Sequence, residues 1–189
     1  MKNIAILSAS IRTGRNSHSV ALYFKNYLEE NKLADTHIID LKTYDFPLFE
    51  ERLRLIEEPT SAMLSFAAEI EKADGIIIVT PEYNGGYPAS LKNVIDLLYA
   101  EWKRKPIAIA TVSAGPFAGT QVITSLQFSL WKIGALVVPA MFPVPTVEKS
   151  FDKVGNALDK PATDKRASVF VNELVYWISA KQQLESNQA

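Results

Sequence analysis

Hydroxyl and arginine side chains gather in one short segment near the start of the chain, residues 8–19, which reads SASIRTGRNSHS. Serine hydroxyls donate hydrogen bonds, and Arg12 or Arg15 could hold two phosphate oxygens at once. A helix that begins near Ser17 would add free backbone amides and the positive end of its dipole, which attract an anion. The segment lacks both the Walker spacing and the glycines of the dinucleotide fingerprint. It therefore predicts a phosphate site; a polar loop with Ser17 as helix cap is the alternative.

Two later segments combine glycines with flat side chains: residues 80–88 read TPEYNGGYP, and residues 111–120 read TVSAGPFAGT. Glycine permits left-handed turns that expose backbone amides, while two tyrosines and Phe117 offer flat surfaces. Either segment alone could be an ordinary connecting turn. Together, the three segments predict a mononucleotide ligand with one phosphate and a planar heterocycle.

The elements that position these segments follow from the apolar pattern. Strands are predicted at residues 3–8, 36–40, 75–80, 107–113 and 136–139. The first, third and fourth are continuous apolar runs, typical of parallel strands covered on both faces. Helical spacing between the strands predicts a single α/β domain, residues 1–189, with a doubly wound sheet of order 2-1-3-4-5. Ligands of such sheets bind beyond the carboxyl ends of the strands, where all three segments lie.

Several helix boundaries are also predicted. Pro88 is expected at the first position of the third helix, and the fourth helix is expected over residues 119–133. Thr163 or Asp164 is expected to cap the last helix. Residues 141–162, which contain three prolines, are expected to form an extended connection to that helix.

Residues 81–96 read PEYNGGYPASLKNVID and closely follow the PEYNxxxPxxLKNxID pattern of the NADPH-dependent FMN reductases. The chain resembles this family of flavodoxin-like proteins, which includes quinone, azo-dye and chromate reductases, up to about Val147. The first segment resembles the family's GSxRxxR pattern, with Ala9 where glycine is usual. Residues 113–119 resemble the family's third flavin loop. The resemblance implies a flavodoxin-like three-layer sandwich, with helices on both faces of the five-stranded parallel sheet.

The resemblance also implies FMN as cofactor and NAD(P)H as co-substrate, with hydride passing through flavin N5 to a quinone or similar small acceptor. No protein acid, base or nucleophile is required, so no catalytic residue is predicted. The phosphate is assigned to Ser10, Arg12, Ser17, His18 and Ser19. The flavin ring is assigned to Pro81, Glu82, Tyr83, Asn84 and Gly85, with Ser113, Ala114, Gly115 and Phe117 on its opposite side. Arg15 is either a partner for an NADPH phosphate or a surface residue.

Composition excludes several other classes of protein. The absence of cysteine rules out disulfides and sulfur-ligated metal sites. With 20 basic and 21 acidic residues and a net charge of −1, a nucleic-acid partner is not expected. The only histidines, His18 and His37, are not expected to form a metal pair. No apolar run is long enough to span a bilayer and the first residues lack a signal-peptide pattern, so a cytoplasmic protein is expected.

Two questions stay open. Apolar residues cover most of the circumference of the helix over residues 95–102, and the next helix carries Phe128 and Trp131. This surplus favours a homodimer or homotetramer; the alternative is a wide core face. The alternative function is a flavodoxin-type FMN electron carrier that acts on protein partners, although such carriers are typically strongly acidic. A nucleotide-binding module without flavin is the third possibility.

Overall fold

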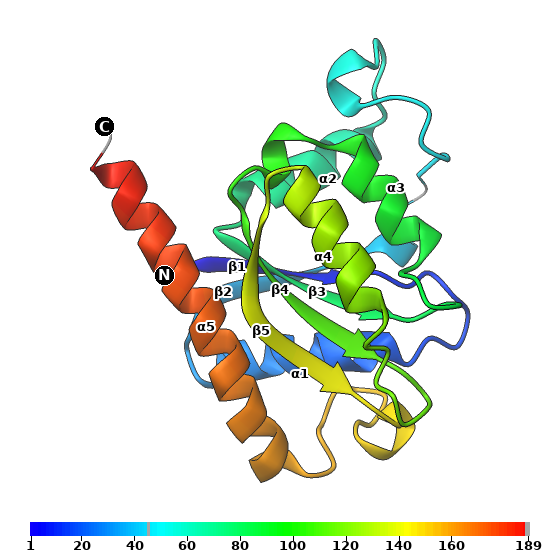
Figure 1. Ribbon diagram of the computed structural model, residues 1–189, viewed down its shortest axis with the longest axis vertical. Coiled ribbons are helices and arrows are strands. Elements are labelled where there is room, and N and C mark those ends of the chain that lie inside the picture. Colours follow the sequence, from blue (N-terminus) through cyan, green and yellow to red (C-terminus); the bar gives the residue numbers. More distant parts are fainter. Residues whose placement is uncertain (45, 188–189) are drawn as a thin grey trace.

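The computed structural model describes residues 1–44 and 46–187. Its five strands form one parallel sheet of order β2-β1-β3-β4-β5, which confirms the predicted topology (Figure 1). The strands are β1 Asn3–Ser8, β2 Asp35–Asp40, β3 Gly75–Pro81, β4 Pro106–Val112 and β5 Leu136–Val144. All four strand pairs are parallel, as continuous apolar runs predict.

Helices cover both faces of the sheet, so the molecule has three layers (Figure 1). One face carries α1 Ser17–Glu30 and α5 Lys160–Ser186; the other carries α2 Ser61–Lys72, α3 Ala89–Leu97 and α4 Val122–Lys132. Short 3-10 helices occupy Leu41–Thr43, Leu53–Leu55, Ala100–Trp102 and Val147–Lys149. Alternate strand residues feed the two cores: Ile4 and Ile6 point to the α1 side, Ala5 and Leu7 to the α2 side.

Four predicted boundaries were wrong. The last helix begins at Lys160, because Asp159 caps it by accepting a hydrogen bond from the Ala162 amide at 3.1 Å. Strand β5 continues to Val144, since its pairing with β4 resumes beyond a register shift, and only residues 145–159 connect it to α5. Pro88 is the N-cap of α3 rather than its first helical residue. In addition, α4 starts three residues later than predicted, at Val122.

Most of the apolar residues at 95–102 are used within the monomer; Tyr99, which is 42% exposed, is the exception. Ile95, Leu97, Leu98 and Trp102 are each at most 4% exposed and belong to the core that α2 also covers. For these residues the wide core face is the correct interpretation, and they give no evidence for a second subunit. Phe128 and Trp131 on α4 differ, because each is 63% exposed.

Within residues 1–44 and 46–187, no helix has the length and apolarity needed to cross a membrane. The same residues contain no group of three or more His, Cys, Asp or Glu side chains placed to hold a metal ion.

Candidate cofactor site

The loops after β1 and β3 meet at the carboxyl edge of the sheet, because these strands are parallel neighbours (Figure 1). The Ser10 hydroxyl lies 2.6 Å from the Tyr83 hydroxyl, and the Ser90 hydroxyl donates to the Ala9 carbonyl at 2.7 Å. The β1 loop is thus connected both to the β3 loop and to the start of α3. Residues more than seventy positions apart in the chain build one site.

A cavity of about 190 Å³ opens between the loops after β1, β3 and β4. Seven predicted site residues line it: Arg12, Ser17, Pro81, Glu82, Tyr83, Ser113 and Ala114. The other predicted residues belong to the same segments of the chain but are not among the lining residues: Ser10, His18, Ser19, Asn84, Gly85, Gly115 and Phe117. The lining also contains residues that were not predicted as cofactor ligands: Gly14, Arg15, Asn16, Val112 and Val147.

The amino end of α1 faces this cavity without a side-chain cap. Its N-cap residue, Asn16, makes no capping hydrogen bond. Instead, the side-chain amide of Asn16 donates to the Glu148 carboxylate at 2.8 Å through Nδ2 and accepts from the Lys153 ammonium at 2.5 Å through Oδ1. The Ser17 hydroxyl is buried and has no hydrogen-bond partner among the described residues. The Ser19 amide donates to the Asn16 carbonyl at 3.2 Å, so the amides before it in the first turn and the Ser17 hydroxyl are the groups left for an anion among the described residues.

Arg15 supports the β1 loop from below. Its guanidinium donates to the Ser10 carbonyl and to Asp40 Oδ1, each at 2.5 Å, and a second bond joins it to Asp40 Oδ2. Both side chains are largely buried. The alternative of a surface residue is therefore wrong for Arg15, whereas its contact with an NADPH phosphate stays a prediction, since Arg15 also lines the cavity. Arg12, which is exposed, makes no ion pair within the described part of the chain.

Two pKa shifts accompany this pair. Burial lowers the pKa of His18 below its ordinary value, and the positive charge of Arg15 lowers it further. Burial opposes ionisation of Asp40, but hydrogen bonds from Arg15 and from the Lys42 amide lower the pKa of Asp40 overall. His18 Nδ1 lies 3.0 Å from the Ser8 hydroxyl, beneath the loop. At neutral pH the β1 loop is therefore supported by the neutral imidazole of His18 and by the ion pair between Arg15 and Asp40.

The β3 loop contains a tight turn that presents its amides outward. Tyr83 and Gly86 exchange two backbone hydrogen bonds, at 2.8 and 3.1 Å. The turn needs positive φ angles at Asn84 (53°) and Gly85 (79°), which explains the Asn-Gly pair in the motif. The Asn84 and Gly85 amides lie at the tip, where both residues are exposed.

The β4 loop is held by the segment that follows β5. The Val147 amide donates to the Ser113 carbonyl and the Thr146 amide to the Gly115 carbonyl, both at 3.0 Å. The Ser113 hydroxyl donates to the Gly115 carbonyl at 2.8 Å, so this hydroxyl already serves the loop itself. Phe117 is 81% exposed at the outer end of the loop.

The residues present fit a flavin mononucleotide. An uncapped helix, an unpartnered buried hydroxyl and a free guanidinium are the donors that a phosphate requires. At the neighbouring strand ends, Tyr83 of the turn at residues 83–86 and Ser113 and Ala114 of the β4 loop line the same cavity, where a flat ring could lie between them. This combination supports binding and orientation of a cofactor rather than acid–base or nucleophilic catalysis by side chains.

Comparison with known proteins agrees with this geometry. Residues 2–149 match the NADPH-dependent FMN reductase family. The chain is 35% identical over 137 residues to the NAD(P)H-dependent FMN reductase LOT6 of Saccharomyces cerevisiae, covering 66% of this chain and 71% of that protein. It is 28% identical over 183 residues to a quinone reductase of Pseudomonas putida, covering 93% and 94% of the two chains.

Among solved structures, the flavoenzyme NAD(P)H:(acceptor) oxidoreductase FerB of Paracoccus denitrificans superposes with a TM-score of 0.79 at 23% identity. The superposition covers 95% of this chain and 98% of that one, and it confirms the predicted flavodoxin-like fold. Flavodoxins share the same fold more distantly, with a TM-score of 0.55 for the protein from Pseudomonas aeruginosa. The family match covers residues 2–149, which is more than half of the chain. The chain therefore belongs to the NADPH-dependent FMN reductase family and is an oxidoreductase.

Proposed function

We propose that the protein is an FMN-dependent NAD(P)H oxidoreductase that reduces a quinone or a similar small molecule. Bound FMN would supply the redox chemistry by accepting hydride from NAD(P)H and passing it to the acceptor. The observation that carries the proposal is the amino end of α1, which has no side-chain cap: the buried Ser17 hydroxyl has no partner among the described residues and lines the same cavity as the exposed Arg12. Relatives named quinone reductase and FMN-dependent NADPH-azoreductase support a small-molecule acceptor.

In this proposal the β1 loop holds the phosphate. Arg12 and the Ser17 hydroxyl donate directly, together with the amides at the start of α1. Ser10 and Ser19 are buried and border the same turn. The Ser10 hydroxyl is hydrogen-bonded to the Tyr83 hydroxyl. His18 would contribute through its backbone, because its imidazole bonds to Ser8 beneath the loop.

The ring would lie between the other two loops. Residues 81–85 present the amides of Asn84 and Gly85 from the tight turn, and residues 113–115 border the opposite side. Backbone donors aimed at the ring would stabilise negative charge on a reduced flavin. Phe117, which is largely exposed, would cover the outer edge of the ring. Positioning and electrostatics are thus the protein's contribution, and no side chain is assigned proton transfer.

The flavodoxin-type carrier is a weaker alternative. Its support is the shared fold, whereas the net charge of −1 and the family match favour the enzyme. Mixing the FMN-loaded protein with NADPH or NADH without oxygen separates the two. Rapid loss of the flavin absorbance, restored by adding a quinone, is expected; no reduction by either nucleotide would favour the carrier.

The phosphate assignment is tested by Arg12→Ala. Loss of the guanidinium should weaken FMN binding by about 1–3 kcal/mol, a factor of about 5 to 150, because charge-assisted hydrogen bonds are lost. The matched control is Arg54→Ala, which removes an exposed arginine that is not among the lining residues and should leave FMN affinity unchanged. Equal affinities for the Arg12 variant and the wild type would contradict the assignment.

We also propose that the protein forms a homodimer or homotetramer through α4. Phe128 and Trp131 lie one helical turn apart, with ring centroids 5.8 Å apart, and they border a cavity of about 350 Å³ with Leu136 and Val137 of edge strand β5. An exposed aromatic pair beside an apolar strand is typical of a protein interface. Light scattering after gel filtration should report a dimer or tetramer, and Phe128→Glu with Trp131→Glu should give the monomer. A monomeric wild type would overturn this assignment.

We place the protein in the cytoplasm, where NAD(P)H is supplied. Fractionation of cells carrying the native chain tests this location, and recovery in another fraction would contradict it. The preference between NADH and NADPH is measured in the same anaerobic mixing experiment.

A further inference from the structure

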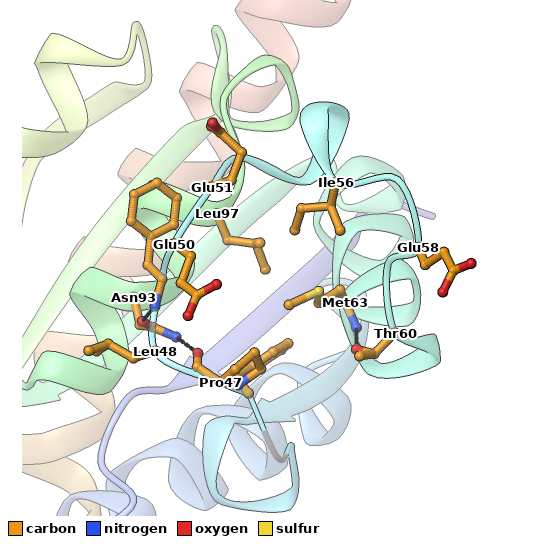
Figure 2. A pocket seen from close by; sticks show the side chains of 12 residues that line it. Pro47, Leu48, Glu50, Glu51, Ile56, Glu58, Thr60, Met63, Asn93 and Leu97 are labelled. Carbon is orange, nitrogen blue, oxygen red and sulfur yellow. Dashed lines mark hydrogen bonds between the residues drawn. The ribbon is translucent and has the colours of Figure 1, made fainter.

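A second cavity, of about 390 Å³, lies beside α2 and α3, away from the cofactor cavity, and the two share no lining residue (Figure 2). Its outer wall is the long connection between β2 and α2, residues 46–60, which we name the strap. In Figure 1 the strap is the cyan segment that extends beyond α2 and α3. A volume of this size is sufficient for a small organic molecule.

The strap is fastened to α3 by one side chain. Asn93 Oδ1 accepts a hydrogen bond from the Phe49 amide at 2.7 Å, and Asn93 Nδ2 donates to the Pro47 carbonyl at 2.9 Å. Both polar atoms of one amide therefore hold the same extended stretch of backbone (Figure 2). Because the strap is attached at a defined distance from α3, the cavity exists before any ligand binds.

The inner wall of the cavity is apolar. Met63 of α2 and Leu97 of α3 are only 7% and 4% exposed and form its base. Ile56 and Pro47 of the strap face them across the cavity (Figure 2). Such a surface favours an apolar or aromatic body, since burial removes apolar area from water.

The charge at the cavity is negative only. Glu50 directs its carboxylate into the space beside Met63 and Leu97, whereas Glu51 and Glu58 stand at the rim and point away (Figure 2). No lysine, arginine or histidine is among the lining residues, and none of the three glutamates forms an ion pair within the described residues. Arg52 of the strap is engaged elsewhere, with its guanidinium 4.7 Å from the ring centre of Tyr99.

The amino end of α2 opposes these charges only in part. Thr60 caps this helix by accepting a hydrogen bond from the Met63 amide, and both residues line the cavity. A helix terminus is equivalent to about half a positive charge, against the full negative charge of the Glu50 carboxylate in the cavity, to which Glu51 and Glu58 add charge at the rim. The net field therefore favours a cation.

We propose that the cavity under the strap binds an amphipathic organic cation, with an apolar or aromatic body against Met63 and Leu97 and an ammonium group beside Glu50. This site is separate from the cofactor cavity and does not depend on the function proposed for it. The ligand is defined by three features: one positive charge, an apolar body and a volume that fits about 390 Å³.

The test uses three probes of equal size that differ in charge: 1-naphthylmethylammonium, 1-naphthylmethanol and 1-naphthoate. Each is titrated into the FMN-saturated wild-type protein and followed by calorimetry and by ligand-observed NMR. The cation should bind about fivefold or more tightly than the neutral probe at low salt, because the Glu50 carboxylate faces it, and added salt should reduce this preference. Equal affinities for the three probes, or preference for the anion, would overturn the proposal.

Variants locate the site. Glu50→Gln should remove the preference for the cation, and Glu50→Lys should reverse it toward the anion. Glu57→Gln is the matched control, since it removes the same charge from the same strap at an exposed position outside the cavity lining. If Glu57→Gln reduced the preference for the cation equally, the probe would be attracted by the surface charge in general, and the proposed site would be overturned. Release of FMN by the cation, seen as a change in flavin absorbance, would place the probe in the cofactor cavity and would also overturn it.

Discussion

The two edges of the sheet use their hydrogen-bonding groups differently. At the amino edge, turns close on themselves: the Asn3 amide donates to Asp74 at 2.7 Å, and the Leu136 amide donates to the Lys105 carbonyl at 3.0 Å. The buried Lys105 ammonium donates to the Glu71 carbonyl at 3.0 Å and to the Ala73 carbonyl, and burial lowers the pKa of Lys105 to about 8. At the carboxyl edge, within residues 1–44 and 46–187, α1 has no side-chain cap and the Ser17 hydroxyl has no hydrogen-bond partner.

The difference shows where stability and function are separated in this fold. Polar groups at the amino edge satisfy one another, so their loss should affect unfolding alone. Groups at the carboxyl edge are held in place but lack some hydrogen-bond partners within the described residues. Their loss should therefore lower the affinity for FMN more than the stability of the fold. One exception is the Arg15–Asp40 pair, which is complete within the protein and supports the β1 loop.

Asp40→Ala should have the largest effect. Removing this carboxylate leaves the largely buried Arg15 without its counter-charge, so unfolding should become easier by about 3 kcal/mol. Urea denaturation of the FMN-free protein measures the change. Asp35→Ala removes an exposed carboxylate from the same strand and should change the free energy of unfolding by less than about 0.5 kcal/mol. Equal effects of the two substitutions would contradict a supporting role for the pair.

Lys105→Met should come next. The substitution keeps the apolar stem but leaves the Glu71 and Ala73 carbonyls unsatisfied, at a cost of about 2 kcal/mol. Affinity for FMN should stay at the wild-type value, because the polar groups at the amino edge bond to one another and not to a ligand. Denaturation and flavin titration check both statements, with the exposed Lys103→Met as control. A large fall in FMN affinity would remove the distinction between the two edges.

Ser17→Ala should have a smaller effect of opposite sign in two measurements. Without cofactor, loss of an unpartnered buried hydroxyl should leave stability unchanged or raise it by up to about 1 kcal/mol. Affinity for FMN should fall by about 1 kcal/mol, because a donor to the phosphate is lost. Ser125→Ala, on the exposed surface of α4, is the control. Reduced stability of the FMN-free variant would show that the hydroxyl serves the fold instead.

The smallest effect concerns pH. Because the pKa of His18 is lowered in the folded protein, the unfolded chain takes up this proton first as the pH falls below 6.5. The free energy of unfolding should therefore decrease from pH 6.5 toward the folded-state pKa, by at most about 1.4 kcal/mol per pH unit. His18→Gln should flatten this slope. Denaturation of the wild type and the variant over a pH series measures the slopes, and identical slopes in the two proteins would exclude the His18 contribution.

The sheet could be predicted from sequence because its strands are short, continuous apolar runs, and β1 agrees at both ends with the prediction. The start of α5 could not, because Asp159, Thr163 and Asp164 are all suitable caps. Tertiary contacts decide between them: the Asp164 carboxylate accepts a hydrogen bond from Tyr23 at 2.8 Å, which leaves Asp159 to cap the helix.

The candidate site shows the same division. The loops with unusual composition were predicted, because glycine, serine and arginine carry a chemical signal at the ends of strands. Val147 carries none, and it reaches the cavity only because β5 ends beside β4. The orientation of the Arg15 side chain depends on its ion pair with Asp40, which the parallel register places opposite Ser8. No spacing along the chain indicates that partner.

The central claim is that the amino end of α1 binds the phosphate of FMN, and riboflavin, which lacks only that phosphate, tests it most directly. Flavin fluorescence titrations of the cofactor-free protein compare the two ligands at the same salt concentration. Two or more charge-assisted hydrogen bonds to the phosphate should make FMN bind at least about 100-fold more tightly than riboflavin. Equal affinities would mean that the phosphate makes no contact with the protein, and the site as described would be wrong.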